Sequence, residues 1–276
     1  MEFYFTNIFR LMCRISPEIK RSLWRMWYQY LTTNDEDADL LFMNYGFANL
    51  DSNAKKLFLK GSDEKYRFCI QLYRHVVSSV NLREKDVLEV GCGRGGGSSH
   101  IVKHLKPKSM TGIDFSEKAI DFCNRYYSID GLSFSHGDAE SLPFEENTFD
   151  VVVNVESSHC YGYMEHFLRE VYRVIRPNGY FLFADFRSKD KIFSLREQLK
   201  NSGFELLKEE IITPNVLRAL ELGHESKLGL IQQKAPKVLH KPLESFIGIK
   251  GSKIYESLRM KEVEYLNYVL QKNHHQ

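Results

Sequence analysis

The chain has 276 residues and a formal net charge of +2, and it is 43% hydrophobic and 27% charged. These values are typical of one large globular domain, or of a domain with an added cap, and the weak positive charge argues against nucleic acid as a partner. No C-x-x-C pair and no run of about 18 apolar residues occurs, so the sequence predicts no disulfide framework, no metal site and no membrane-spanning helix.

The first 80 residues show helical spacing with breaks rather than strand alternation. Residues 3–15 mix apolar side chains with basic ones, which indicates either a helix packed on the domain or an amphipathic segment in peripheral contact with a membrane. Because the basic residues lie within and after the apolar stretch, the segment does not resemble a signal peptide, and we expect a cytoplasmic protein. One helix is expected from Ser16-Pro17 and another over Ser62–Val80. Residues 1–80 are therefore expected to form a helical cap, either as a lid over the site or as additional core.

From residue 81 onwards, short apolar runs alternate with segments of helical spacing. This alternation predicts an α/β domain over residues 81–276, with a mostly parallel sheet and helices on both faces. Ligands in such sheets bind beyond the carboxyl ends of the strands. Strands are predicted at 87–90, 110–114, 132–136, 150–155, 180–186 and 204–212, and helices at 98–105, 116–128, 163–175 and 192–202.

The C-terminal part departs from this alternation. Residues 213–240 are polar with helical character, which predicts a helical insertion. Phe246–Gly251 is expected to form a short strand or a turn. Val263–Leu270 alternates weakly and is expected to be a seventh, antiparallel strand at the edge of the sheet.

The glycine-rich run at residues 86–97, DVLEVGCGRGGG, follows the first predicted strand. A Cβ atom would hinder both a turn with positive φ and the close approach of a ligand to the backbone, so glycines here indicate a ligand-binding loop. The run also satisfies G-x-G-x-x-G through Gly91, Gly93 and Gly96, with Asp114 about 20 residues further on. The glycines alone therefore leave a dinucleotide cofactor possible.

Four ordered motifs extend beyond the glycines and argue against a dinucleotide. With them the chain resembles class I S-adenosylmethionine-dependent methyltransferases, which implies a Rossmann-like fold and S-adenosylmethionine as cofactor. The motifs are E-x-G-x-G-x-G at Glu89–Gly95, G-I-D at Gly112–Asp114, G-D-A-E-x-L-P-F at Gly137–Phe144 and L-R-E-V-x-R-V-I-R-P-x-G at Leu168–Gly179.

Further segments, among them F-M-N-Y-G-F at Phe42–Phe47, N-V-E-S-S-H-C-Y at Asn154–Tyr161 and F-I-G-I-K-G at Phe246–Gly251, cover most of the chain. With these the chain is similar to the phthiotriolone/phenolphthiotriolone dimycocerosates methyltransferase group, which O-methylates hydroxyls on large lipids. The resemblance implies a hydrophobic small molecule or lipid as the partner. The sequence carries no signal for the oligomeric state.

The resemblance assigns expected cofactor contacts. The cofactor is expected to approach the backbone at the glycines, and Glu89 is expected to order that loop. Asp114 is expected to contact the ribose, and the residues after the third strand are expected to contact the adenine. The Asn154 backbone is expected to contact the methionyl part. The complete expected set is Glu89, Gly91, Cys92, Gly93, Gly95, Asp114, Phe115, Asp138, Ala139 and Asn154.

His159 follows the fourth predicted strand and Asp185 ends the fifth. A hydroxyl must lose its proton during methylation, and histidine is the natural base near neutral pH, so His159 is the candidate general base and Asp185 the residue that orients it. The alternatives are a packing residue at His159 and a capping acid at Asp185. At the level of the whole protein, the alternatives are a C-methyltransferase acting on a quinone-like or sterol-like acceptor, and a non-catalytic protein that binds the cofactor or a lipid.

Overall fold

The computed structural model describes residues 16–33, 40–51, 53, 55–234 and 236–273. The amphipathic segment expected at residues 3–15 lies outside these ranges. Within them, no helix is both long and apolar enough to cross a membrane.

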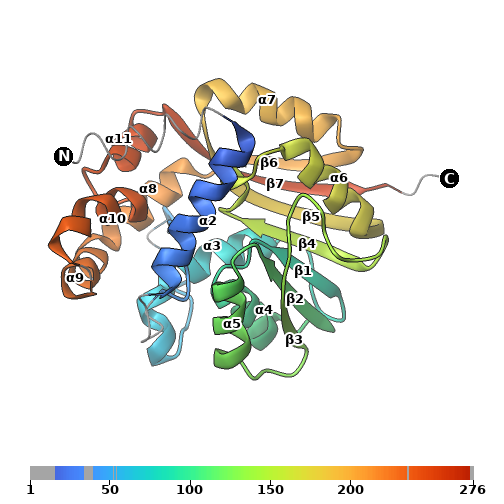
Figure 1. The fold of residues 1–276 in the computed structure, drawn as a ribbon, viewed down its shortest axis with the longest axis horizontal. Helices are drawn as coiled ribbons and strands as arrows, with labels where there is room; N and C mark the ends of the chain where they lie inside the picture. The colour runs from blue at the N-terminus through green and yellow to red at the C-terminus, as the bar shows by residue number, and fades with distance from the viewer. Residues whose placement is uncertain (1–15, 34–39, 52, 54, 235, 274–276) are drawn as a thin grey trace.

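A seven-stranded sheet forms the centre of the molecule, with the strand order β3-β2-β1-β4-β5-β7-β6 (Figure 1). The five strands from β3 to β5 pair in parallel, and only β7 pairs antiparallel with its neighbours. The predicted Rossmann-like, mostly parallel sheet is thus confirmed. The strands are β1 Asp86–Val90, β2 Ser109–Asp114, β3 Leu132–His136, β4 Phe149–Val155, β5 Ile175–Ser188, β6 Phe204–Ile211 and β7 Val263–Lys272.

The position predicted for the last strand was wrong. Strand β7 is antiparallel as expected, but it lies between β5 and β6, with Val269 opposite both Leu182 and Lys208. Its side chains are buried on both faces of the sheet, including Tyr265 and Leu266. A strand buried on both faces has a nearly continuous apolar run, which explains why the alternation in the sequence is weak.

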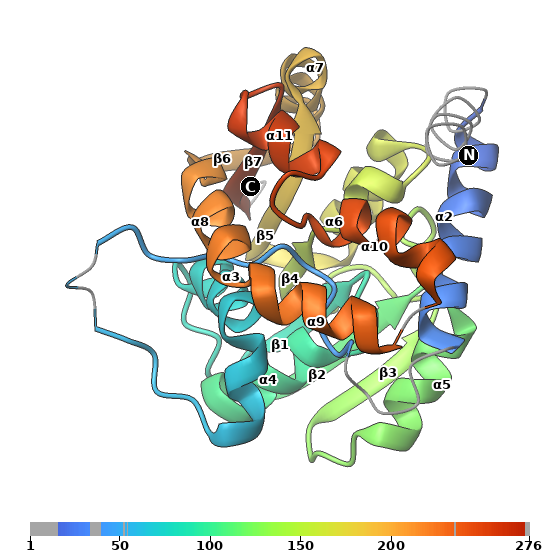
Figure 2. The same ribbon diagram turned by 90° about the vertical axis from the view of Figure 1, so that its left-hand side faces the viewer.

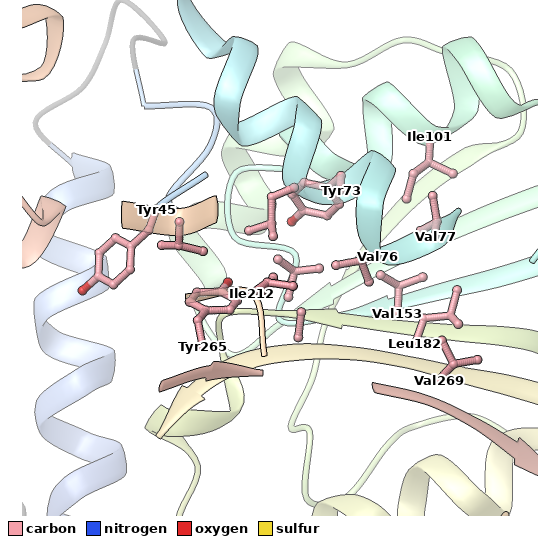
Figure 3. Packing of buried hydrophobic residues seen from close by; sticks show 14 of the residues in the cluster. Tyr45, Tyr73, Val76, Val77, Ile101, Val153, Leu182, Ile212, Tyr265 and Val269 are labelled. Atoms are coloured by element: carbon pink, nitrogen blue, oxygen red, sulfur yellow. The ribbon is translucent and has the colours of Figure 1, made fainter. Parts of the chain in front are cut away.

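Helices cover both faces of the sheet, as predicted. One face packs against α3 Arg67–Val77, α4 Gly96–Leu105, α8 Thr213–Leu222 and α11 Lys253–Arg259, and the other against α6 Met164–Val174 and α7 Lys189–Lys200. Figure 3 shows the core on the α3 side, where Val76 and Val77 face Val153 and Leu182 of the sheet. Helix α5, Glu117–Tyr126, packs beside β2 and β3.

The segments outside the sheet are helical, with some differences from the prediction. The helix expected over residues 62–80 is divided into the 3-10 helix η1, Gly61–Tyr66, and α3. The polar stretch after β6 contains α8, α9 His224–Lys234 and η3 Lys237–Leu239. It continues into α10, His240–Ile247, which Gly248 closes with φ +77°. Phe246–Gly251, predicted as a short strand or a turn, is therefore the end of this helix followed by a turn.

Helix α2, Pro17–Thr33, runs across the carboxyl-end side of the sheet (Figure 1). It packs against α5 and against the 3-10 helix η2, Ser158–Cys160, which follows β4. Its position brings an N-terminal element directly over the strand ends, where ligands of this fold class bind.

Candidate active site

A cavity opens beyond the carboxyl ends of the parallel strands. Its walls come from the loops after β1, β2, β3 and β4, from α2 and from residues 41–44. This is the location at which open α/β sheets bind ligands. Seven of the predicted cofactor residues line it: Gly91, Cys92, Gly93, Asp114, Phe115, Asp138 and Ala139.

The turn after β1 requires glycine for two different reasons. Gly91 has φ +75°, and a Cβ atom there would lie 2.3 Å from the Ser157 Oγ, so the turn lies directly against the loop after β4. Gly95 also has a positive φ, but its Cβ would meet the Phe134 ring at 2.6 Å. Gly95 does not line the cavity, and in this structure its lack of a side chain serves the packing of the turn on β3.

Asp114 ends β2 and presents a half-buried carboxyl group to the cavity. Its Oδ2 accepts from the Gly93 N–H at 2.8 Å and its Oδ1 from the Ser116 N–H at 2.9 Å. Burial raises the pKa of Asp114, and these two backbone donors offset part of that rise. Because a carboxylate offers about four acceptor positions, Asp114 retains acceptor capacity for ligand hydroxyls.

The loop after β3 contacts α2. The Asp138 carboxylate forms a short ion pair with Arg21, whose second terminal nitrogen lies 3.4 Å from a carboxylate oxygen of Glu140. The Arg21 guanidinium also lies over the Phe115 ring, 5.1 Å from its centroid. Two predicted cofactor residues, Phe115 and Asp138, are thus in contact with an arginine of α2 in this structure.

Glu89 and Asn154 lie behind the cavity wall and do not line it. The Glu89 carboxylate accepts from the Tyr73 hydroxyl at 2.6 Å and forms a short hydrogen bond with Ser98. Burial raises the pKa of Glu89 to about 7. The Asn154 side-chain amide donates to Ser157 Oγ at 2.8 Å and to the carbonyl oxygen of Val90 at 2.9 Å. Both residues therefore hold the loops of the cavity in place.

His159 and Asp185 are in direct contact. Strands β4 and β5 pair in parallel, so the residues that follow β4 reach the end of β5. The His159 Nδ1 lies 3.0 Å from Asp185 Oδ1, and the His159 backbone N–H donates to Asp185 Oδ2 at 2.8 Å. Burial acts to raise the pKa of Asp185, but the Arg187 guanidinium and His159 outweigh it and hold that pKa well below its usual range. Asp185 is therefore a carboxylate, and Nδ1 of His159 carries the proton between them.

Aromatic rings enclose the His159 imidazole. The Trp24 ring of α2 lies edge-on to it, with 5.4 Å between centroids, and the Phe186 ring lies 4.4 Å away. His159 is not among the residues that line the cavity, although its neighbours Ser157 and Cys160 are. The imidazole thus lies beside the cavity, in largely apolar surroundings between α2 and β5.

Sequence reasoning missed three ionisable residues of the site. Glu156 lines the cavity and accepts from the Tyr45 N–H and the Tyr265 hydroxyl, both at 2.9 Å, and burial raises its pKa to about 8. Ligands in this fold class bind beyond the carboxyl ends of the strands, and this rule pointed to Asp114. Glu156 directly follows β4, so the same rule could have found it. It could also have found Arg187, the partner of Asp185, which is next to Phe186 near the end of β5. No local signal identifies Arg21, because its role depends on how α2 docks.

The lining residues offer the kinds of group that an adenosine-containing cofactor needs. Gly91 and Gly93 give bare backbone with positive φ at the cavity wall. Asp114 offers carboxylate acceptors for hydroxyl groups, and Phe115 and Ala139 offer apolar surface for a ring. This chemistry fits S-adenosylmethionine.

Comparison with known proteins agrees with this match. A family model for the methyltransferase domain matches residues 88–183. The phthiotriol/phenolphthiotriol dimycocerosates methyltransferase of Mycobacterium tuberculosis (strain ATCC 25618 / H37Rv) is 35% identical over 270 residues, which cover 98% of this chain and 99% of that protein. A fatty-acid O-methyltransferase of Mycolicibacterium smegmatis is 35% identical over 259 residues, which cover 94% of this chain and 93% of that protein.

Among solved structures, that of the [4+2]-cyclase SpnF superimposes with a TM-score of 0.68 and 19% sequence identity, covering 92% of this chain and 96% of that chain. At this identity the likeness shows the fold alone.

Proposed function

Since this chain belongs to the family of S-adenosylmethionine-dependent methyltransferases that includes these two mycobacterial relatives, we propose that it methylates a hydroxyl oxygen on a lipid-related acceptor, with His159 as the general base. The chain is a methyltransferase that uses S-adenosylmethionine. The observation that supports the proposed chemistry is the contact of 3.0 Å between His159 Nδ1 and Asp185 Oδ1 beside the cofactor cavity.

In this proposal different cavity residues contact different parts of the cofactor. Asp114 accepts from the ribose hydroxyls, Phe115 and Ala139 cover the adenine, and Asp138 accepts from its amino group. Gly91 and Gly93 allow the backbone to approach the methionyl part, while Glu89 and Asn154 hold the loops from behind. When bound, S-adenosylmethionine supplies an electrophilic methyl group on a sulfonium.

The protein's own contribution is to orient the acceptor and remove its proton. With Nδ1 donating to the Asp185 carboxylate, Nε2 is the ring atom that can accept the hydroxyl proton. Asp185 then stabilises the imidazolium that forms, and it stays ionised because of Arg187 and His159. The Trp24 and Phe186 rings limit water around the imidazole, which strengthens these electrostatic interactions.

The aromatic surroundings of His159 support a hydrophobic acceptor. The Trp24 ring also contacts Phe246 of α10, and the Tyr45 ring stacks on Phe186, so apolar surface extends from the imidazole in two directions. The names of the two relatives state action on phthiotriol dimycocerosates and on fatty acids. We therefore propose an acceptor whose hydroxyl is attached to a hydrocarbon chain.

Transfer of an isotopically labelled methyl group tests the proposal. The purified chain is incubated with methyl-labelled S-adenosylmethionine and a panel of aliphatic alcohols and hydroxy acids, and the products are identified by mass spectrometry. We expect labelled methyl ethers together with release of S-adenosylhomocysteine. Label attached to carbon, or no labelled product from any hydroxyl-bearing acceptor, would contradict O-methylation of a hydroxyl.

A further inference from the structure

A second cavity, of about 350 Å³, adjoins the cofactor cavity. Residues 40–45, the end of η1 and the helices α9 and α10 form its walls; Figure 2 shows α9 and α10 side by side in front of the sheet. Phe42, Met43 and Asn44 line both cavities and so form a common wall. The volume lies in the range of small-molecule sites, about 300–1,000 Å³.

The polar groups of this second cavity favour an anion. Two lysines, Lys65 and Lys227, line it, and no aspartate or glutamate occurs among the described lining residues. Lys227 belongs to α9, and its ammonium donates to the carbonyl oxygen of Tyr45 at 3.4 Å. Burial lowers the pKa of Lys227, and Cys69 and Glu156 offset only part of this effect. An anion beside Lys227 would supply the missing compensation.

Asn44 marks the place where the two cavities meet. The residue is 8% exposed and lines both cavities, so a ligand in the second cavity can extend along the shared wall towards the first. Its Oδ1 has no hydrogen-bond partner among the described residues, but this oxygen is itself buried and adds no contact for a ligand.

We propose that the second cavity binds the hydrocarbon chain of an acceptor that carries a carboxylate, and that Lys227 contacts this carboxylate. The rest of the lining is mainly apolar, with Leu230, Leu243 and Phe246 available to the chain. The chain then passes Asn44 towards the cofactor cavity.

The carboxylate and the methylated oxygen are separate groups in this arrangement. Lys227 and His159 are linked through a series of contacts. Lys227 contacts the backbone carbonyl of Tyr45, the Tyr45 ring stacks on Phe186 at 5.5 Å between centroids, and Phe186 contacts His159. The inferred substrate class is therefore an aliphatic hydroxy acid. This assignment rests on the proposed function in taking a hydroxyl as the methyl acceptor.

Binding of octanoate and octanol, measured by calorimetry with saturating S-adenosylhomocysteine, tests the assignment without turnover. We expect the wild type to bind octanoate more tightly than octanol by about tenfold, the usual scale for a hydrogen bond to a charged group. Lys227→Met removes the ammonium but keeps the length of the side chain, so octanoate affinity should fall to that of octanol while octanol affinity stays unchanged. Lys241→Met, on the exposed side of α10 next to Glu244, is the matched control and should change neither.

A second variant blocks the cavity without removing a charge. Gly229 lines the cavity, and a Cβ atom added there meets no atom within 4 Å, so Gly229→Leu adds an apolar side chain at the cavity wall without a clash at its Cβ. Both ligands should then bind at least about tenfold more weakly. Octanoate affinity that is unchanged by Gly229→Leu, equal affinity of wild type for both ligands, or equal loss of both in Lys227→Met would overturn the inference.

Failure of the inference and failure of the proposed function have different signatures. Charge-dependent octanoate binding without methylation of any hydroxy acid would support the cavity assignment and remove the proposed reaction. Methyl ether formation at equal rates by wild type and Lys227→Met, from hydroxy acids and simple alcohols alike, would support the reaction and remove the assignment of Lys227.

Discussion

Three buried carboxyl groups near the cavity differ in charge because their neighbours differ. Asp185 is held as a carboxylate by Arg187 and His159 despite its burial. For Glu89 and Glu156 burial dominates, and it raises their pKa to about 7 and about 8. Asp185 can therefore stabilise a cation, whereas Glu156 is mostly protonated at neutral pH and holds Tyr45 and Tyr265 in place through hydrogen bonds.

The raised pKa of Glu156 predicts a pH dependence of stability. In the unfolded chain the pKa of a glutamate is about 4.3, whereas the pKa of Glu156 in the folded protein is about 8. Between these values the folded state binds more protons than the unfolded chain, so rising pH lowers the free energy of unfolding until about pH 8. Glu156→Gln removes this contribution because the amide stays neutral.

Thermal unfolding of the wild type and Glu156→Gln from pH 5 to pH 9 measures the effect. The melting temperature of the wild type should fall relative to that of the variant as pH rises towards about 8. Glu165→Gln, an exposed change on α6, serves as the control and should leave the difference from wild type constant. A constant difference for Glu156→Gln as well would show that Glu156 does not carry the predicted proton.

At the scale of elements, the turn after β1 shows how backbone geometry and packing act together. Gly91 and Gly131 have similar positive φ angles, +75° and +78°. A Cβ atom at Gly91 would lie 2.3 Å from Ser157 Oγ, whereas at Gly131 the nearest atom, the Lys108 carbonyl oxygen, is 3.6 Å away. The two positions thus carry the same backbone strain and differ in steric overlap.

Alanine substitutions at these two glycines separate the two contributions. Gly131→Ala should lower the free energy of unfolding by about 1–2 kcal/mol, the cost of a left-handed conformation with a side chain. Gly91→Ala should cost clearly more and should also weaken S-adenosylhomocysteine binding, because the loop after β4 must move. Urea unfolding and calorimetry give both quantities. Equal losses of stability with unchanged binding would mean that the turn and that loop are not in close contact.

Helix α2 closes the same cavity from the N-terminal side. Lys20 Nζ donates to the Tyr161 carbonyl oxygen at 2.6 Å, and Arg21 pairs with Asp138. Because the proposed adenine contact uses the same Asp138 carboxylate, Arg21 and the cofactor compete for it. Arg21→Met should therefore tighten S-adenosylhomocysteine binding about two- to fivefold, as expected for losing a partly exposed ion pair.

Arg25 provides the matched comparison for this competition. Its guanidinium also lies over the Phe115 ring, 4.8 Å from the centroid, and no ion pair joins it to Asp138 in the described structure. Arg25→Met should therefore leave the affinity near that of the wild type in the same calorimetric titration. Weaker binding by Arg21→Met would show that Arg21 holds the cofactor instead of competing with it.

At the scale of the whole molecule, local sequence patterns predicted the strands whose limits are set by nearby residues. Apolar runs and turn residues placed β1 to β4 and β6 within about one residue, because each of these strands is bounded by such a turn or helix start. The predicted start of β5 was too late, because β5 begins at Ile175 and continues through Pro177 and Gly179. The position of β7 in the sheet depends on its pairing with β5 and β6. The sequence pattern of residues 263–272 does not indicate which strands will be its neighbours. The burial of β7 on both faces was visible only as weak alternation.

The residues of the candidate site also differ in whether local sequence patterns could predict them. Asp114 ends β2 and His159 follows β4, so their positions at the ends of strands identified them. Asp185 was predicted to end its strand but lies inside β5, directly after Ala184, the last residue of β5 that pairs with β4. Arg21 and Trp24, whose ring lies edge-on to His159, come from an N-terminal helix whose docking depends on tertiary contacts. Sequence reasoning therefore predicted some of the residues at the ends of the strands, missed Glu156 and Arg187 there, and missed the residues that approach from α2.

The most direct test of the proposed mechanism is turnover by His159→Ala, measured together with its binding of S-adenosylhomocysteine. Loss of a general base typically costs about 10²–10⁴ in rate, so turnover of the hydroxyl acceptor should fall by that factor while cofactor affinity stays near the wild-type value. His166→Ala, an exposed histidine of α6, controls for the loss of an imidazole elsewhere. Turnover that is unchanged in His159→Ala would contradict the assignment of His159 as the base, and a parallel loss of cofactor binding would show that the residue acts through packing.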